Sequence, residues 1–456
     1  MTMDMTKGPV MRSMLRFAVP MILGNLLQQC YNIVDTLIVG QFIGADALAA
    51  VGSAFTLMTF LTSILLGLCM GSGNVFSIRF GERNEEALRE SVCASFVLIS
   101  GLTVLLNVLA FVFLEQISVL LQVPAEVWGL MREYLLVIFC GIAATFLYNY
   151  FASYLRAIGN SIVPLIFLGI SAVLNIALDL LFIIGFKWGV SGAAIATVVS
   201  QYVSGIGIAV YTLKKSMRLE KIKCRFNIRF SCVKEIAGFS VLTCIQQSVM
   251  NLGILMVQGL VNSFGTTIMA AFAAAVKIDA FAYMPVQDFG NAFSTFISQN
   301  YGAKKEERIR RGLKGAVFVT CAFGLVVSVI VCAFAGQLMT IFVGMKEPEI
   351  VAQGVRYLRI EGAFYFAIGC LFLLYGLYRA IGKPGMSVVL TFISLGTRVL
   401  LAYILSDLPI FGVTGIWWAV PIGWFHADLV GILYYVFRIN RHHLKEENSV
   451  HETAIS

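Results

Sequence analysis

Two aspartates lie inside long apolar stretches of the sequence, where a charged side chain is costly. Asp35 is 5 residues from the end of the run 16–40, and Asp179 is 6 residues from the end of the run 161–185. If both runs are membrane helices, each carboxyl lies about 8–9 Å from the same boundary at 1.5 Å per residue. An Asp near a helix centre costs about 2.5–3.5 kcal/mol, so such residues tend to be functional. Two carboxyls close together in an apolar setting can share one proton.

Three further oxygen-bearing residues are expected at the same depth. Asn175 and Asp179 are four residues apart and therefore share one helix face. Thr197 is about 7 residues into a later apolar run, and Tyr134 is near the start of another. Carboxylate, amide and hydroxyl oxygens also suit a hard cation. The pattern predicts a site for a proton or for Na⁺; the competing interpretation is that each Asp bonds a nearby hydroxyl for packing.

The amino-acid composition indicates that these polar residues lie in membrane-spanning elements. Hydrophobic residues make up 59% of the 456 residues and charged residues 13%, against about 45–50% and about 25% in soluble domains. This excludes a soluble fold, disorder and a collagenous chain. The 10 Cys are scattered, which argues against a disulfide framework or a zinc site. No HExxH, GxSxG, P-loop or paired-Asp metal motif occurs, so we expect neither an enzyme nor a cofactor.

Apolar runs of about 20 residues recur along the chain, and each is long enough to cross a bilayer as a helix. We expect an all-α polytopic membrane protein with twelve transmembrane helices. The predicted spans are 16–40, 51–77, 92–114, 132–155, 161–185, 190–213, 236–262, 279–301, 315–335, 356–377, 385–407 and 413–437.

The basic residues predict the orientation of these spans. With the N-terminus inside, the inner gaps carry 26 of the 33 Lys and Arg, the outer gaps and span edges carry 6, and Arg398 lies within a span. Cytoplasmic loops are rich in Lys and Arg. We therefore predict a multi-pass protein of the cell (inner) membrane with both termini cytoplasmic. The net charge of +8 is explained by this bias, and nucleic-acid binding is not expected.

The chain also repeats itself, which predicts two pseudo-symmetric six-helix lobes. Because six is even, the repeats are parallel, as in many secondary transporters. The matching segments are GADALAA at 44–50 with GTTIMAA at 265–271, SIRFGERNEEALR at 77–89 with SQNYGAKKEERIR at 298–310, and RAIG at 156–159 with RAIG at 379–382. The predicted domains are an N-terminal lobe 1–213, a cytoplasmic linker 214–235, a C-terminal lobe 236–437 and a cytoplasmic tail 438–456.

These segments carry a family resemblance over nearly the whole chain. The first span with Pro20 and NLLQQCYNIVDTLIVGQFIGADALAAVG resembles the first helix of the multidrug and toxic compound extrusion (MATE) family. The paired RAIG turns and the SIRFGERN and SQNYGAKK loops resemble that family too. The resemblance implies a V-shaped pair of lobes that opens alternately to each side. It also implies efflux of amphipathic, often cationic compounds in exchange for H⁺ or Na⁺.

The resemblance assigns roles to particular residues. MATE transporters like this one have a coupling site with Asp in the first helix, Tyr in the fourth, Asn and Asp in the fifth, and Thr in the sixth. The spacing places these on Asp35, Tyr134, Asn175, Asp179 and Thr197. The family's first-helix proline, linked there to helix bending, corresponds to Pro20.

The second lobe does not repeat this site. The repeat carries Asp35, Asn175 and Asp179 onto Met256, Arg398 and Ala402. Glu361 is about 5 residues into the tenth span, and we predict an ion pair with Arg398; binding of a substrate's charge is the rival role. Candidates for a substrate cavity are Asp288, Gln246, Gln247, Glu361, Arg398 and His426, although His426 is more typical of a satisfied core histidine.

The leading hypothesis is an ion-coupled multidrug antiporter with no cofactor. We expect small amphipathic substrates, a lipid bilayer around the protein and a monomeric state. H⁺ is favoured over Na⁺ because two ionised Asp in an apolar lobe are expensive, whereas one shared proton neutralises the pair. The alternative is a flippase for a lipid-linked sugar of the same superfamily. Only Arg398 is deeply placed, and several cations would be needed to hold a pyrophosphate.

Overall fold

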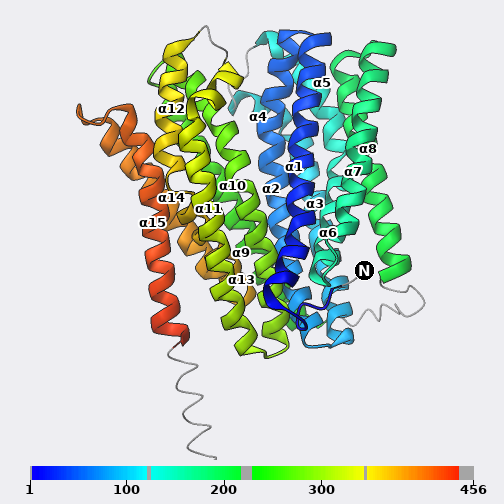
Figure 1. The fold of residues 1–456 in the computed structure, drawn as a ribbon. Helices are drawn as coiled ribbons and strands as arrows, with labels where there is room; N and C mark the ends of the chain where they lie inside the picture. Colours follow the sequence, from blue (N-terminus) through cyan, green and yellow to red (C-terminus); the bar gives the residue numbers. More distant parts are fainter. Residues whose placement is uncertain (1–2, 121–124, 217–228, 344–346, 441–456) are drawn as a thin grey trace, which may run out of the picture. The chain divides into compact units, whose positions relative to one another are not determined.

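The computed structural model describes residues 3–120, 125–216, 229–343 and 347–440, and every element of more than one turn in these ranges is helical (Figure 1). The central part of the predicted linker and nearly all of the predicted tail lie outside the described residues. The helices of the first repeat are α1 (Val10–Phe42), α2 (Ala45–Gly81), α3 (Glu85–Val112), α4 (Leu114–Leu120), α5 (Ala125–Cys140), α6 (Ile142–Ala157), α7 (Ile162–Asp179) and α8 (Gly189–Tyr211). Those of the second repeat are α9 (Phe230–Asn262), α10 (Thr266–Gly302), α11 (Glu306–Val343), α12 (Pro348–Gly362), α13 (Tyr365–Ala380), α14 (Pro384–Ser406) and α15 (Val413–Tyr434). Short π-helical turns follow α7 (Leu180–Gly185), α8 (Thr212–Ser216) and α15 (Tyr435–Asn440).

Ten of the described helices are long and apolar enough to cross a membrane, and the number is twelve if each of two bent helix pairs counts as one span. One pair joins Val127–Cys140 to Ile142–Ala157 at 44°, and the other joins Pro348–Gly362 to Tyr365–Ala380 at 51°. The prediction of an all-α polytopic fold is confirmed. The bends show that two predicted spans are broken helices.

The bounds of the helices follow the sequence repeat. The helix α2 begins at Ala45 and α10 at Thr266, and they end at Gly81 and Gly302, so both ends are 221 residues apart. The two bent pairs break at corresponding places in the two repeats. Local signals explain some of these ends. The Asn84 side chain accepts a hydrogen bond from the backbone N–H of Ala87 at 3.0 Å and caps α3.

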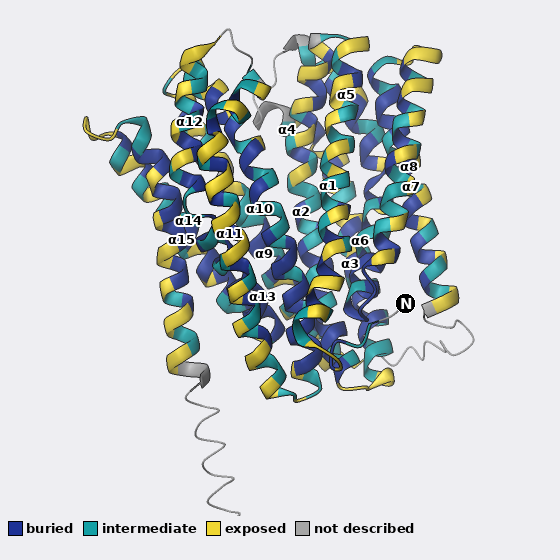
Figure 2. Cartoon of the chain, in the orientation of Figure 1, coloured by how far each residue is buried: buried dark blue, intermediate teal, exposed yellow. Residues whose placement is uncertain are grey.

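Figure 2 shows exposed residues along the helices beside buried ones, and many of the exposed residues are large and apolar. On α3, Val97, Val104, Val108 and Val112 are all more than half exposed. A surface of this kind is unfavourable in water and suits contact with lipid.

Packing divides the chain into two compact units that differ from the predicted lobes. Unit 1 comprises Met1–Ser248, Ala292–Gly312 and Ala380–Gly382, and unit 2 comprises Val249–Asn291, Leu313–Arg379 and Lys383–Ser456. Unit 1 therefore includes the last part of α10 and the first part of α11, although both helices belong to the second repeat. The lobe boundaries taken from the sequence remain a prediction.

Candidate functional site

Asp179 is placed by an unusual ending of its helix. It is the last α-helical residue of α7, and the π-helical turn Leu180–Gly185 follows it directly. Its side chain is fully buried. A π-helical turn changes the hydrogen-bond register of the backbone and is frequently found at functional sites. The change of register immediately after Asp179 therefore marks this carboxyl as a functional candidate.

Asp35 on α1 meets Asp179 within unit 1. The two carboxyls lie within hydrogen-bonding reach of each other. Among the described residues, none donates a hydrogen bond to either Asp179 oxygen or to Asp35 Oδ1. Two ionised carboxylates are acceptors only and cannot bond each other, whereas a protonated carboxyl is a donor. One shared proton would therefore supply the donor that this pair needs.

The other three predicted residues lie around this pair. The Asn175 side-chain amide donates to Thr197 Oγ1 at 3.3 Å, and its own oxygen has no hydrogen-bond partner among the described residues. Tyr134 is buried and close enough to interact electrostatically with both aspartates. The helices α1, α5, α7 and α8 thus bring all five predicted residues into one region of unit 1.

Tyr31 is a member of this region that the sequence analysis did not identify. It precedes Asp35 by four residues on α1 and interacts electrostatically with it. The same four-residue spacing that linked Asn175 to Asp179 could have found it. Pro20 lies inside α1, where the missing backbone N–H weakens the helix, and its bending role remains a prediction.

Unit 2 contains a second pair of buried carboxyls. Tyr357 donates to Glu361 Oε2 at 2.6 Å, one helical turn away on α12. Asp279 on α10 lies within hydrogen-bonding reach of Glu361, and Arg398 on α14 interacts electrostatically with both. Glu361 Oε1 and Asp279 Oδ1 have no hydrogen-bond donor among the described residues. Tyr357 is held in turn by aromatic packing against Phe272 and Trp417 in the core of unit 2.

One prediction about this region is wrong, and one residue of it was missed. No direct ion pair joins Glu361 to Arg398, both of which the structure describes; a tyrosine and a second carboxyl approach Glu361 instead. Asp279 was missed because the predicted span began at that residue. The helix α10 begins at Thr266, so Asp279 lies well inside it.

The remaining cavity candidates do not form one site within either unit. Gln246 and Gln247 are buried on α9 in unit 1, whereas Asp288 is buried on α10 in unit 2. His426 is exposed on α15 and forms a hydrogen bond with Thr397 Oγ1 at 2.9 Å. The interpretation of His426 as a core histidine is therefore wrong, because its side chain is exposed.

Comparison with known proteins identifies the family. The MatE family model matches residues 20–181 and 240–404. The chain belongs to the MATE family. The probable multidrug resistance protein YpnP of Bacillus subtilis is 30% identical over 86% of this chain and 87% of its own. The probable multidrug resistance protein YoeA of the same organism is 28% identical over 96% of each chain.

A solved MATE structure shares the fold. It is described as the outward-facing conformation of a multidrug resistance MATE family transporter of the MOP superfamily. It superposes with a TM-score of 0.90 at 24% identity, over 96% of this chain and 98% of its own. The two matched segments of the MATE model start 220 residues apart, in agreement with the internal repeat. The protein is thus a multi-pass membrane transporter and not an enzyme.

Proposed function

We propose that this MATE protein exports amphipathic, often cationic compounds by antiport against an ion gradient. The names of its relatives support multidrug transport as the general activity. The repeat supports an alternating-access cycle, since paired six-helix halves are a common transporter architecture. The basic residues support an orientation with the N-terminal segment on the cytoplasmic side. The flippase alternative is less consistent with these relatives.

The proposed coupling site is the Asp35–Asp179 pair, with H⁺ as the favoured ion. The observation that carries the proposal is that the half-buried Asp35 carboxyl lies next to the fully buried Asp179 carboxyl, with no described donor to either Asp179 oxygen or to Asp35 Oδ1. Binding one proton removes a buried negative charge and lets one carboxyl donate to the other. Release of that proton restores two like charges, which disfavours the same arrangement and can drive a conformational change. Asn175, Thr197, Tyr134 and Tyr31 would orient the pair.

Na⁺ is the second candidate ion, because the amide oxygen of Asn175 and the hydroxyl of Thr197 are hard ligands. No group of three or more His, Cys, Asp or Glu side chains is assembled for a metal in the described part of the chain. A Na⁺ ion would therefore depend on the two aspartates and neutral oxygens. The proton is favoured because one proton neutralises the pair, whereas Na⁺ would require both carboxylates to be ionised in an apolar setting.

The test is dye efflux from reconstituted vesicles with H⁺ and Na⁺ gradients imposed separately. Inward proton movement in Na⁺-free medium should drive efflux. Asp35→Asn and Asp179→Asn should reduce it to the level of protein-free vesicles, because Asn keeps the shape and cannot carry the proton. Asp46→Asn is the matched control, since Asp46 is exposed in the first turn of α2. Efflux that requires Na⁺ and ignores the pH gradient would assign the coupling to Na⁺.

A further inference from the structure

The segment that precedes α1 is buried against the turns of unit 1. Met5 is fully buried and Thr6 is 5% exposed. The backbone N–H of Met3 donates to the carbonyl oxygen of Gly159 at 3.0 Å. At Gly159, in the first RAIG turn, a Cβ would lie 1.9 Å from the Met3 carbonyl oxygen. Only glycine allows this close approach, so the segment is fixed at one end by the first repeat.

The other side of this segment is held by residues of the second repeat that belong to unit 1. These residues are at the end of α10 and the start of α11, and most of them bond backbone carbonyls of the segment. Arg308 Nη2 donates to Met5 O at 3.0 Å and to Lys7 O at 3.2 Å, Arg308 Nη1 to Gly8 O at 2.9 Å, Lys305 Nζ to Thr6 O at 2.8 Å, Asn300 Nδ2 to Met5 O at 3.2 Å, and the backbone N–H of Met5 to Gln299 Oε1 at 3.0 Å.

Next to the segment, the ends of α2 and α10 touch through two glycines. A Cβ on Gly81 would lie 2.0 Å from the Gln299 carbonyl oxygen, and a Cβ on Gly302 would lie 2.1 Å from the Ile78 carbonyl oxygen. Gly81 corresponds to Gly302, and Ile78 to Gln299, under the same shift of 221. The contact is therefore reciprocal and lies between equivalent helix ends of the two repeats. Asn74 Oδ1 adds a polar contact by accepting from Ser294 Oγ at 3.0 Å.

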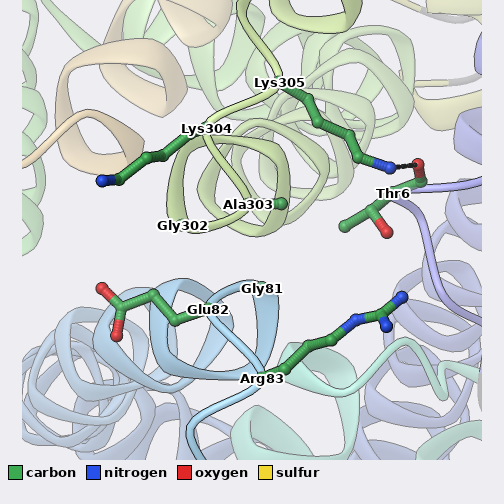
Figure 3. A pocket seen from close by; sticks show the side chains of 8 residues that line it. All are labelled: Thr6, Gly81, Glu82, Arg83, Gly302, Ala303, Lys304 and Lys305. Carbon is green, nitrogen blue, oxygen red and sulfur yellow. Dashed lines mark hydrogen bonds between the residues drawn. The ribbon is translucent and has the colours of Figure 1, made fainter.

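The segment borders a pocket of about 430 Å³ at this end of unit 1 (Figure 3). In Figure 3, Gly81 and Gly302 lie on opposite sides of the pocket, and Lys305 reaches Thr6. Most of the bonds that hold the segment are hydrogen bonds to its backbone carbonyls, and several of them are exposed or only partly buried. Once the segment detaches, water can satisfy the groups that it leaves, so release does not require a helix to unfold.

We propose that residues 3–8 form a latch that holds the ends of α2 and α10 together and must be released each time this end of the transporter opens. The inference rests on the alternating-access cycle proposed above. In such a cycle equivalent ends of the two repeats separate on one side of the membrane and close on the other. The latch bonds the first repeat through Gly159 and the second through residues 299–308. Separation of the two therefore requires that one set of these bonds break.

The first experiment makes the latch permanent. Thr6→Cys and Lys305→Cys are combined in a functional background that lacks the 10 native cysteines. A short bis-methanethiosulfonate reagent, which joins the two thiols across the distance that the Lys305 side chain spans, should abolish transport, and a reductant should restore it. The single-cysteine variants are the controls and should keep transport after the same treatment. If the crosslinked protein transports normally, the segment is a fixed anchor and the latch proposal is overturned.

The second experiment needs no transport and so tests the latch separately from the proposed function. Ser298→Cys, fully buried in the closed contact, reports opening through its rate of reaction with a thiol reagent. Arg308→Gln should raise that rate roughly tenfold, because it removes charge-assisted hydrogen bonds to the segment. Arg311→Gln is the matched control, since among the described residues the ion pair of Arg311 is with Glu307 on the same helix, and the change should leave the rate unchanged. Equal rates in both variants would overturn the latch.

Discussion

At the residue scale, the two carboxyl pairs differ in the charges around them. Asp35 and Asp179 have tyrosines and an amide nearby, whereas Asp279 and Glu361 also have the cation Arg398. A nearby cation partly compensates the negative charge of a buried carboxyl pair, and its removal leaves that charge uncompensated. We therefore expect the pair Asp279 and Glu361, together with Arg398, to stabilise the fold, and we do not expect this of Asp35 and Asp179.

Arg398→Gln alone should lower the thermal stability of the purified protein, because two buried carboxyls lose their cation. Asp279→Asn in the same chain should recover part of the loss. The expected coupling is about 0.5–3 kcal/mol for groups in one network, measured as a double-mutant cycle by thermal unfolding in detergent. Additive effects of the two changes would show that Arg398 and Asp279 act independently.

Asp4 provides a charge that stays constant over physiological pH. Partial burial acts to raise its pKa. Hydrogen bonds from Thr6 and the charges of Lys7 and Arg83 outweigh this effect and hold the pKa below the ordinary value of 3.8. A carboxyl with a lowered pKa stabilises the folded state above its unfolded pKa, and this contribution is lost as pH falls through the folded pKa.

The effect of Asp4→Asn on the Ser298→Cys labelling rate should therefore be the same at pH 5.5 and pH 8. Both rates are measured in an Asp179→Asn chain, to remove the proposed coupling proton, and normalised to labelling of the unfolded protein. A larger effect at pH 8 would mean that Asp4 titrates in this range, contrary to the expectation.

At the scale of the elements, the sequence predicted where helices are and missed how they end. The apolar run 51–77 lies within α2, which extends over Ala45–Gly81. Helices continue past the hydrocarbon core because polar residues are tolerated near the membrane surface. In the same way, α10 extends beyond the predicted span 279–301, so Asp279 lies inside the helix and was missed. The π-helical turn after Asp179 could not be predicted, because the apolar residues 180–184 carry no signal of a change in hydrogen-bond register.

The reciprocal glycines at the ends of α2 and α10 lead to a prediction about these elements. Gly81→Ala and Gly302→Ala should each force the helix ends apart, because a Cβ at 2.0–2.1 Å from a carbonyl oxygen cannot be accommodated. Labelling of Ser298→Cys should accelerate in both variants. Gly101→Ala on α3 is the control, since nothing lies within 4 Å of its Cβ. Unchanged labelling in the two test variants would mean that this end opens without separating these helices.

At the scale of the whole molecule, the repeat was the most informative feature of the sequence. A shift of 221 to 223 residues relates the matched segments, and the helix bounds follow it. The five residues of the proposed coupling site could be predicted because membrane depth follows from position in a helix. The contact of residues 3–8 with residues 299–308 could not, because it joins segments about 300 positions apart by bonds to backbone carbonyls, which leave no mark on residue type.

The orientation of the protein in the membrane remains a prediction. It determines whether the latch closes the cytoplasmic or the outer side of the transporter. The distribution of Lys and Arg places the turn at Lys304 on the cytoplasmic side and the turn at Ile410 outside. Both positions are exposed, Ile410 at 91%, so a cysteine at either can react. In intact cells, an impermeant thiol reagent should label Ile410→Cys and spare Lys304→Cys, and inverted vesicles should reverse the result. Because flanking basic residues set orientation during insertion, the opposite labelling would show that the positive-inside bias fails here. It would also place the latch on the outer side.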